Sequence, residues 1–234
     1  MWKKEQIGKA VLYLGDCKEI LSQLKSEKQT VAAVITDPPY GIGRKYTKAY
    51  NDTHIDYPAW LWERLLIAEE LCSPGSPVFV FQSTLNVRKF SKWFLRDWRL
   101  YIAAKNFIQM SKNSVMTYGY DCVVCWWSPG KPYTRGTRNR DFFLSNTAIE
   151  VSRTKNLSRE HPYPRPLAQM YVFLEQWVRP GGCVLDPFMG GGTTLVAAEQ
   201  LGLSSIGIEI EEKYFDLACT RVHNAAKLGW FFSR

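Results

Sequence analysis

The sequence predicts an α/β fold built on an open, mostly parallel sheet. Segments with strand-like patterns alternate with segments of helical periodicity along the whole chain. Residues 31–36 form a continuous apolar run rich in β-branched side chains, typical of a strand buried on both faces of a parallel sheet. The 234 residues contain no internal repeat and no long linker, so we expect one domain over residues 1–234.

The individual elements follow from periodicity and from the residues that interrupt it. Seven short apolar segments are predicted strands: residues 11–14, 31–36, 77–81, 100–107, 121–127, 183–185 and 205–210. Six segments with apolar residues at helical spacing are predicted helices: residues 17–25, 58–71, 85–98, 167–178, 194–201 and 213–226. Two stretches read as loops, a basic and aromatic one over residues 41–57 and a Gly-, Pro- and Arg-rich one over residues 128–166.

The composition narrows the class of protein. The 30 basic and 22 acidic side chains give a formal net charge of +8, which favours a polyanionic partner. Hydrophobic residues make up 46% of the chain, so a packed core is expected and disorder is excluded. No apolar run reaches the ~18 residues of a membrane span. The first residues lack the apolar stretch of a signal peptide, which predicts a cytoplasmic protein.

The six cysteines are expected to be thiols, as in a reducing compartment. Cys122 and Cys125 have the spacing of half a metal site. They lie in a predicted strand, however, where positions i and i+3 face opposite sides. No second pair of cysteines and no paired histidines accompany them, whereas such ligands come in sets of about four. We therefore expect no metal site.

A glycine-rich turn near the end of the chain predicts a nucleoside site. Residues 184–194 run from a buried strand through Gly190, Gly191 and Gly192 into a helix, so backbone N–H groups can approach a ligand closely. Glu209 follows Gly190 by 19 residues (209 − 190), a distance at which a carboxylate can accept bonds from ribose hydroxyls. No lysine follows the glycines, which excludes a phosphate-binding P-loop. Asp186 would repel a pyrophosphate and suits a cationic group such as an amino-acid ammonium.

A second turn, Asp37-Pro38-Pro39-Tyr40, follows the predicted strand 31–36. The carboxyl ends of strands are where open α/β sheets bind ligands. The two prolines remove N–H donors, so this turn offers carbonyl and carboxylate acceptors. Such an array suits an amino group with two hydrogens to donate and a ring that stacks on Tyr40.

Together these motifs resemble the S-adenosylmethionine-dependent amino-methyltransferases of DNA, in the class whose catalytic motif precedes its cofactor motif. Residues 37–40 match the catalytic motif and residues 186–194 match the cofactor loop, with Gly191 where serine or alanine is usual. Residues 161–166 (HPYPRP) resemble a His-Pro-x-x-Lys-Pro segment, with Arg165 replacing the lysine. Residues 12–17 (LYLGDC) resemble the opening strand, whose aspartate approaches the cofactor's adenine.

The resemblance implies a Rossmann-like methyltransferase fold with a seven-stranded, twisted, mostly parallel sheet, helices on both faces and a circularly permuted motif order. It assigns the catalytic role to Asp37, Pro38, Pro39 and Tyr40. It assigns S-adenosylmethionine binding to Asp16, Cys17, Asp37, His161, Arg165, Asp186, Phe188, Gly190, Gly191, Gly192, Thr193, Thr194 and Glu209.

The implied reaction is methyl transfer to the exocyclic N6 amine of a flipped adenine in duplex DNA. Asp37 and the Pro38 carbonyl would accept the two amine hydrogens while the base stacks on Tyr40. Methylation of cytosine N4 is the alternative, although relatives acting there more often begin this turn with serine. An RNA methyltransferase and a non-catalytic nucleic-acid-binding protein remain further readings.

Basic residues in the two loops are the expected DNA contacts, because lysine and arginine bind phosphates with salt-sensitive affinity. They are Arg44, Lys45, Lys48, Arg135, Arg138, Arg140, Arg153 and Lys155. By resemblance, residues 129–160 form a small target-recognition insertion. The class also suggests a homodimer, a cognate restriction endonuclease as partner, and a bacterial, phage or plasmid source.

Overall fold

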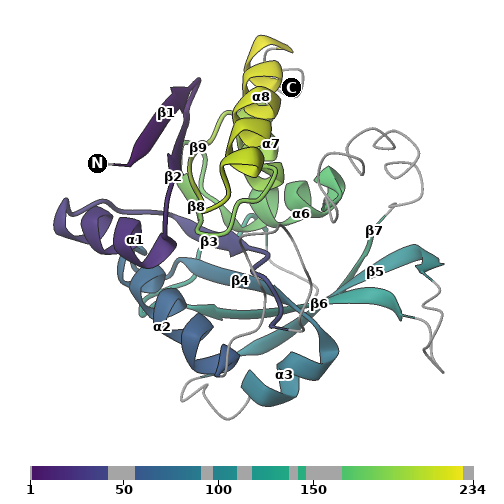
Figure 1. Cartoon of the computed structure of the whole chain (residues 1–234). Coiled ribbons are helices and arrows are strands. Elements are labelled where there is room, and N and C mark those ends of the chain that lie inside the picture. Colours follow the sequence, from purple (N-terminus) through teal and green to yellow (C-terminus); the bar gives the residue numbers. More distant parts are fainter. Residues whose placement is uncertain are drawn as a thin grey trace.

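The computed structural model describes residues 2–41, 56–90, 97–109, 118–136, 142–145 and 165–228. Their strands form one sheet in the order β1-β2-β9-β8-β3-β4-β6-β5-β7 (Figure 1). The strands are β1 (Lys3–Ile7), β2 (Ala10–Leu14), β3 (Ala33–Thr36), β4 (Pro77–Gln82), β5 (Arg99–Gln109), β6 (Tyr118–Trp127), β7 (Phe142–Ser145), β8 (Cys183–Asp186) and β9 (Ser204–Glu209).

The sheet is mostly parallel, as predicted. Neighbouring strands run parallel from β2 through β9, β8 and β3 to β4, and β7 is parallel to β5. Among the described strands, β1 pairs antiparallel with β2, and β6 pairs antiparallel with both β4 and β5. The last two strands of the chain, β8 and β9, lie between β2 and β3, which is the permuted order expected from the motifs.

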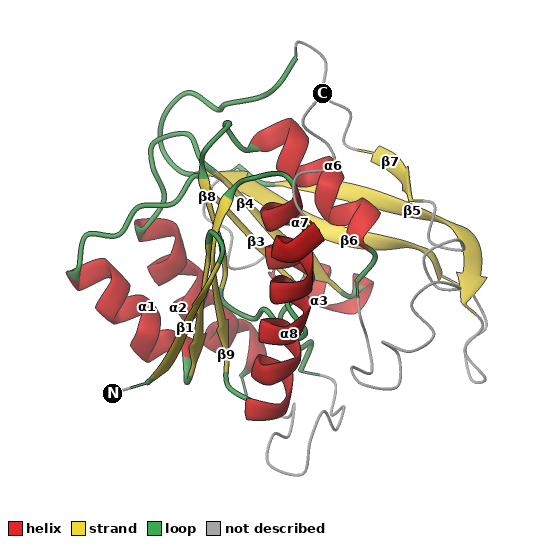
Figure 2. Cartoon of the chain, turned by 90° about the horizontal axis from the view of Figure 1, so that it is seen from above, coloured by secondary structure: helices red, strands yellow, loops and turns green. Residues whose placement is uncertain are grey.

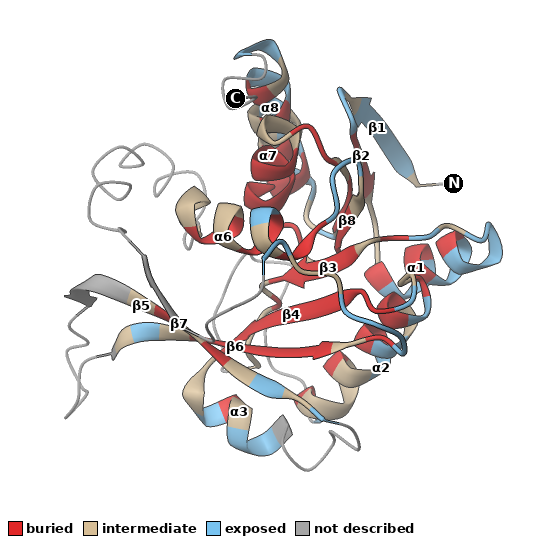
Figure 3. Cartoon of the chain, turned by 180° about the vertical axis from the view of Figure 1, so that it is seen from behind, coloured by how far each residue is buried: buried red, intermediate tan, exposed pale blue. Residues whose placement is uncertain are grey.

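Helices cover both faces of the sheet (Figures 1 and 2). The helices are α1 (Cys17–Ser26), α2 (Tyr57–Glu70), α3 (Thr84–Phe90), α6 (Leu167–Trp177), α7 (Thr193–Gln200) and α8 (Glu212–Leu228). One apolar cluster joins α1 and α2 to the sheet, and two others lie beneath α6, α7 and α8. β3 and β4 are buried along their whole length between these layers (Figure 3).

The sheet differs from the seven-strand prediction, because the described residues contain nine strands. β1 and β7 are the additional ones, and both lie at sheet edges. β1 is mostly exposed and polar, so it lacks the apolar pattern of a buried strand. β7 has four residues and lies within the stretch that was predicted to be a loop. The helix predicted over residues 85–98 was also too long. α3 ends at Phe90, and residues 97–98 are non-helical and lead into β5, while residues 91–96 lie outside the described part.

All six cysteines are free thiols. Cys122 and Cys125 are buried in β6, at positions paired with both neighbouring strands. Within the described ranges, no cluster of three or more histidine, cysteine or acidic side chains is arranged to hold a metal ion. The helices in the same ranges include none with the length and apolar character needed to cross a membrane.

Candidate active site

Four acidic residues meet at one edge of the sheet because parallel strands end there. β2, β3, β8 and β9 run in the same direction, and their carboxyl ends lead to Asp16, Asp37, Asp186 and Glu209. The permuted order places β8 directly beside β3, so the glycine turn after β8 and the proline turn after β3 are neighbours. This arrangement follows the rule that open α/β sheets bind ligands at this edge.

The Asp37 carboxylate is held by Arg165, which lies just before α6. Arg165 Nε donates to Asp37 Oδ2 at 2.6 Å, and an Arg165 Nη2 hydrogen reaches Oδ1 at 3.0 Å. The Tyr40 hydroxyl donates to the same Oδ1 at 2.9 Å and also receives a bond from Arg165. Burial raises the pKa of Tyr40, so this phenol stays protonated at neutral pH.

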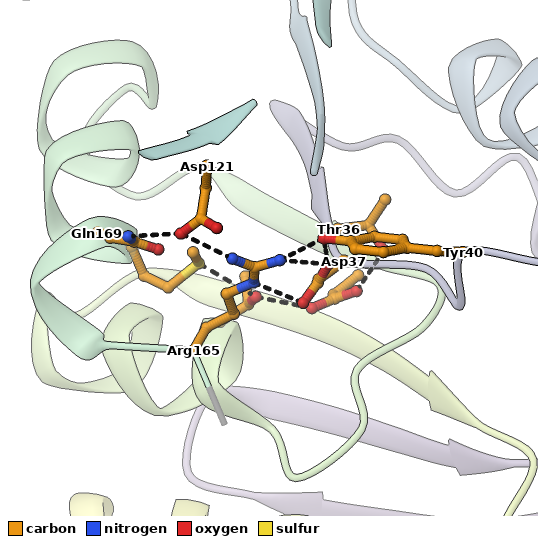
Figure 4. A network of polar contacts seen from close by, with 9 residues as sticks. Thr36, Asp37, Tyr40, Asp121, Arg165 and Gln169 are labelled. Atoms are coloured by element: carbon orange, nitrogen blue, oxygen red, sulfur yellow. Dashed lines mark hydrogen bonds and ion pairs between the residues drawn. The ribbon is translucent and has the colours of Figure 1, made fainter. Parts of the chain in front are cut away.

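Arg165 also has a second carboxylate partner. Its Nη1 is 2.9 Å from Asp121 Oδ2, and Gln169 Nε2 donates to that same oxygen at 3.2 Å (Figure 4). The guanidinium lies over the Phe81 ring, 4.5 Å from its centroid. Burial opposes the charged form of Arg165, but Asp37, Tyr40 and Asp121 together outweigh it, and the pKa of the guanidinium is raised.

The hydrogen-bond inventory of Asp37 leaves one oxygen with spare capacity. Oδ1 accepts from both Arg165 and Tyr40, which uses its two lone pairs. Oδ2 accepts one bond, from Arg165, among the contacts recorded in the described ranges. The carboxylate is therefore fixed in plane and still able to accept another N–H at Oδ2.

The backbone of the proline turn is fixed from another side. Asn86 of α3 is buried and donates to the Tyr40 carbonyl at 2.7 Å and to Gln82 Oε1 at 3.0 Å. Gln82 in turn donates to the Tyr57 hydroxyl at 3.0 Å. This buried chain links α2, β4 and α3 to the carbonyl of the candidate catalytic turn.

Asp186 is buried and joins the two turns. Its Oδ1 accepts from Thr36 Oγ1 at 2.7 Å and from the Phe188 amide at 3.2 Å, and its Oδ2 accepts from Thr194 Oγ1 at 2.7 Å. Burial raises the pKa of Asp186 to about 6, although these three bonds favour the ionised form. Asp186 thus ties β3 to the glycine loop, and its contact with an ammonium group stays a prediction.

The glycine loop adopts conformations that suit only glycine. Gly190 and Gly192 have φ values of 50° and 75°, in the left-handed region. Gly192 precedes α7 and contributes no side-chain cap to the first amides of that helix. Arg221 of α8 donates to the Gly191 carbonyl, and its Nη1 is 3.2 Å from Thr193 Oγ1. Arg221 of α8 therefore holds the loop in place, and no side chain of the described residues caps the first backbone amides of α7.

Glu209 and Asp16 lie side by side because β9 pairs with β2. The Gly15 amide donates to the Glu209 carbonyl at 2.9 Å. Burial raises the pKa of the Glu209 carboxyl to about 7, although hydrogen bonds from backbone amides favour the ionised form and lower this pKa. Asp16 caps α1 by accepting from the Lys18 amide at 2.8 Å, and its other oxygen lies 3.8 Å from Arg64.

Two aromatic rings pack together near Arg64, the residue that faces Asp16. The Phe188 and Trp60 rings are tilted against each other with centroids 5.6 Å apart. Arg64 lies over Trp60, 4.4 Å from its centroid.

Cys17, next to Asp16 in the sequence, is buried, and burial raises the pKa of its thiol to about 12. This thiol is therefore not a nucleophile at neutral pH.

Several candidate residues lie outside the described part of the chain: His161, Arg44, Lys45, Lys48, Arg138, Arg140, Arg153 and Lys155. Of the basic residues assigned to DNA contact, Arg135 is described. It is exposed, and its amide donates to the Gln176 carbonyl at 2.8 Å. The proposed insertion, residues 129–160, is described at 129–136 and 142–145.

A model of the DNA methylase family matches residues 31–220 of the chain. The chain belongs to this family. This DNA methylase is similar to the type II methyltransferase M.HpaI of Haemophilus parainfluenzae, with 24% identity over 228 residues, 88% of this chain and 73% of that protein.

Two solved structures share the fold of this DNA methylase. The complex of M1.HpyAVI with SAM has a TM-score of 0.69 at 24% identity and covers 90% of this chain and 98% of its own. The cytosine-N4-specific PvuII DNA methyltransferase has a TM-score of 0.69 at 18% identity, covering 92% of this chain and 87% of its own.

Sequence reasoning missed three residues that this DNA methylase uses to build its turn: Asp121, Gln169 and Asn86. Asp121 lies at the boundary of an apolar run. That position indicates a site residue only when the direction of the strand in the sheet is known. β6 is antiparallel to β4, so it begins at the edge where the parallel strands end. Gln169 and Asn86 are polar residues on the buried faces of helices, and sequence periodicity alone does not say what they contact.

Proposed function

We propose that this chain transfers the methyl group of S-adenosylmethionine to the exocyclic N6 amine of an adenine in duplex DNA. The observation that carries the proposal is the Asp37 carboxylate, fixed by Arg165 with an acceptor site left on Oδ2, beside the glycine loop that follows β8. Family membership supports methylation of DNA, while the cofactor, the base and the residue roles are the content of the proposal.

The residues at the carboxyl edge fit S-adenosylmethionine. A carboxylate at the end of β9 suits two ribose hydroxyls, and Glu209 is partly buried there. Asp16 would accept from the adenine amino group, and Phe188 and Trp60 offer an aromatic flank beside it. The left-handed glycines bring backbone close to the ligand, as a bulky side chain would not allow.

The charges of the site also fit this cofactor. Asp37 and Asp121 pair with Arg165, Asp186 and Glu209 contact the glycine loop, and Arg221 holds that loop, so four acidic groups face two basic ones here. When bound, the cofactor supplies an activated methyl group on a positively charged sulfonium. A carboxylate-rich edge suits that charge, whereas it would disfavour the pyrophosphate of a dinucleotide.

The chain's part in the reaction is to hold the target amine. Asp37 Oδ2 and the Pro38 carbonyl would accept its two hydrogens and so direct the nitrogen lone pair out of the base ring. The Tyr40 ring, with its hydroxyl fixed by Asp37 and Arg165, would provide the stacking surface. As the bond between nitrogen and the methyl carbon forms, the bond from that carbon to the sulfonium sulfur would break with its electron pair left on sulfur, and the amine would release one proton, for which Asp37 Oδ2 is the proposed acceptor. No cysteine nucleophile is needed.

The choice of adenine rests on Asp37 as the first residue of the turn, since the resembling enzymes that act on cytosine N4 more often have serine. Cytosine N4 is the second candidate, favoured by the fold shared with the cytosine-N4-specific PvuII enzyme. Either base must leave the duplex stack, at a cost of a few kcal/mol. The basic residues of 129–160 and of the loop after Tyr40 are the proposed phosphate contacts.

The direct test is incubation of the protein with S-adenosylmethionine and unmethylated genomic DNA, followed by modification-sensitive sequencing. The expected product is N6-methyladenine in one short sequence context. N4-methylcytosine would replace the base assignment while keeping the enzyme class. DNA binding without any methyl incorporation would reject the proposal in favour of a binding protein.

Two variants complete this test. Asp37→Ala is expected to abolish methyl transfer while calorimetry still detects cofactor binding. Glu175→Gln, an exposed acidic residue on α6, serves as the charge-matched control and should behave as the unaltered protein.

A further inference from the structure

The Arg165 guanidinium makes polar contacts with three side chains at once. Nε and Nη2 face Asp37, Nη2 also reaches the Tyr40 hydroxyl, and Nη1 pairs with Asp121. The side chains of Arg165 and Asp121 are 17% and 15% exposed, so water screens this ion pair weakly. Figure 4 shows Arg165 lying between the proline turn and the start of β6.

Asp121 is itself oriented. Gln169, fully buried on α6, donates to the oxygen that faces Arg165, while its own Oε1 finds no recorded partner within the described ranges. A buried amide that leaves one polar atom unpaired costs free energy. The side-chain hydrogen bond that Gln169 does make is to Asp121, which indicates that the orientation of the Asp121 carboxylate matters at the site.

The two carboxylates share one cation. If Arg165 lost Asp121, its full charge and all its donors would be free to turn toward Asp37, including toward Oδ2. That oxygen is the acceptor the proposed reaction needs. With Asp121 in place, Nη1 is occupied and the guanidinium plane is fixed by contacts at three nitrogens.

We propose that Asp121 is a positioning residue for methyl transfer: with Gln169 it fixes the Arg165 guanidinium, so that Asp37 is held in plane and its Oδ2 stays available to the target amine. Asp121 acts through Arg165 and does not touch the base. The inference rests on the proposed function for its catalytic consequence, but the fixing of Arg165 is a property of the protein without substrate.

The first measurement is single-turnover transfer of tritiated methyl groups to genomic DNA at saturating cofactor, with calorimetric cofactor affinity beside it. Asp121→Asn is expected to lower the rate about tenfold, as for a lost buried charged contact, with cofactor affinity within about twofold of the unaltered protein. Asp121→Glu should recover part of the rate. A rate unchanged in Asp121→Asn overturns the inference, as does an equal loss of cofactor affinity and rate in both variants.

The second measurement needs no activity. Nitrogen-detected NMR follows the exchange of the Arg165 guanidinium hydrogens with water, assigned by comparison with Arg165→Lys. Exchange should accelerate about fivefold or more in Asp121→Asn and should not change in Glu175→Gln. Unchanged exchange in Asp121→Asn means that Asp121 does not fix Arg165 and overturns the inference. If the unaltered protein transfers no methyl group, the proposed function fails, and this readout still decides whether Asp121 fixes Arg165.

Discussion

At the scale of single residues, the candidate catalytic carboxylate is defined by its neighbours more than by its own identity. Asp37 appears in the sequence as an acceptor beside two prolines, but its orientation depends on Arg165, 128 residues away. The resemblance assigned Arg165 to cofactor binding. Its side chain contacts Asp37, Tyr40, Asp121 and Phe81, so we propose that it orients the turn, and its contact with the cofactor stays a prediction.

The replacement of the family's lysine by Arg165 can be tested directly. Arg165→Lys keeps the charge but cannot serve Asp37, Tyr40 and Asp121 from three separate nitrogens. The saturated methyl-transfer rate is expected to fall about tenfold or more while cofactor affinity changes little. Single-turnover kinetics and calorimetry check this. A loss of affinity with an unchanged rate would instead support the cofactor-binding assignment.

Glu209 predicts a pH dependence of cofactor affinity. Burial raises its pKa to about 7, and the ionised form is the better acceptor for ribose hydroxyls. Ionisation increases as pH rises through that value, so affinity should strengthen by roughly tenfold from pH 6 to pH 8. Calorimetry over this range measures the effect. Glu209→Gln should bind more weakly and lose most of the pH dependence; an equally steep profile in that variant would contradict the assignment.

At the scale of elements, strand direction decides which side chains meet. β3 and β8 are parallel neighbours, so the turns that follow them come together. β6 runs antiparallel to β4, so its first residues reach the same edge and bring Asp121 to Arg165. The glycine loop depends on its neighbouring helix as well, since a Cβ on Gly192 would lie 2.9 Å from the Cβ of Ala218 in α8.

This close approach makes Gly192 a test of the loop. Gly192→Ala would place a side chain in the left-handed region, costing about 1–2 kcal/mol, and would add the contact with Ala218. We expect a lower melting temperature and at least a tenfold loss of cofactor affinity, measured by thermal denaturation and calorimetry. Gly119→Ala is the control, because a Cβ there meets nothing within 4 Å. Equal behaviour of the two variants would show that the loop tolerates a side chain.

At the scale of the whole molecule, the net charge of +8 lies on a chain whose candidate site is rich in carboxylates. Attraction of a polyanion must therefore come from basic residues around the site. Three arginines of the proposed insertion, Arg135, Arg138 and Arg140, are the sequence's candidates, and Arg135 is exposed.

Neutralising those three arginines to glutamine should weaken DNA binding and lower the slope of log affinity against log salt by about 0.9 per lost phosphate contact. Fluorescence anisotropy over a salt series measures both quantities. The matched control replaces with glutamine three exposed lysines at or near the ends of α1 and α8: Lys25, Lys28 and Lys227. If both triple variants bind alike, the arginines belong to an ordinary solvated surface.

Local patterns were sufficient for much of the fold and for part of the site. The apolar runs and helical spacing located seven strands and six helices, because burial imposes those periods on the sequence. The same patterns missed β1, which is polar and mostly exposed at the sheet edge, and β7, which is four residues long within a Gly-, Pro- and Arg-rich stretch, and they overextended α3. Both ligand turns were recognisable because each motif is contiguous and requires particular residues for its backbone conformation: prolines in residues 37–40 and glycines in residues 190–192.

By itself the sequence determined the parallel α/β class, the two ligand turns and their order along the chain. Only the tertiary structure decided how the Asp37 carboxylate is held, since Arg165, Asp121 and Gln169 come from three separate segments. The physical reason is that periodicity reports which residues are buried and contiguous motifs report local backbone needs. The partner of a buried charge is set by strand order and strand direction, which no local pattern contains.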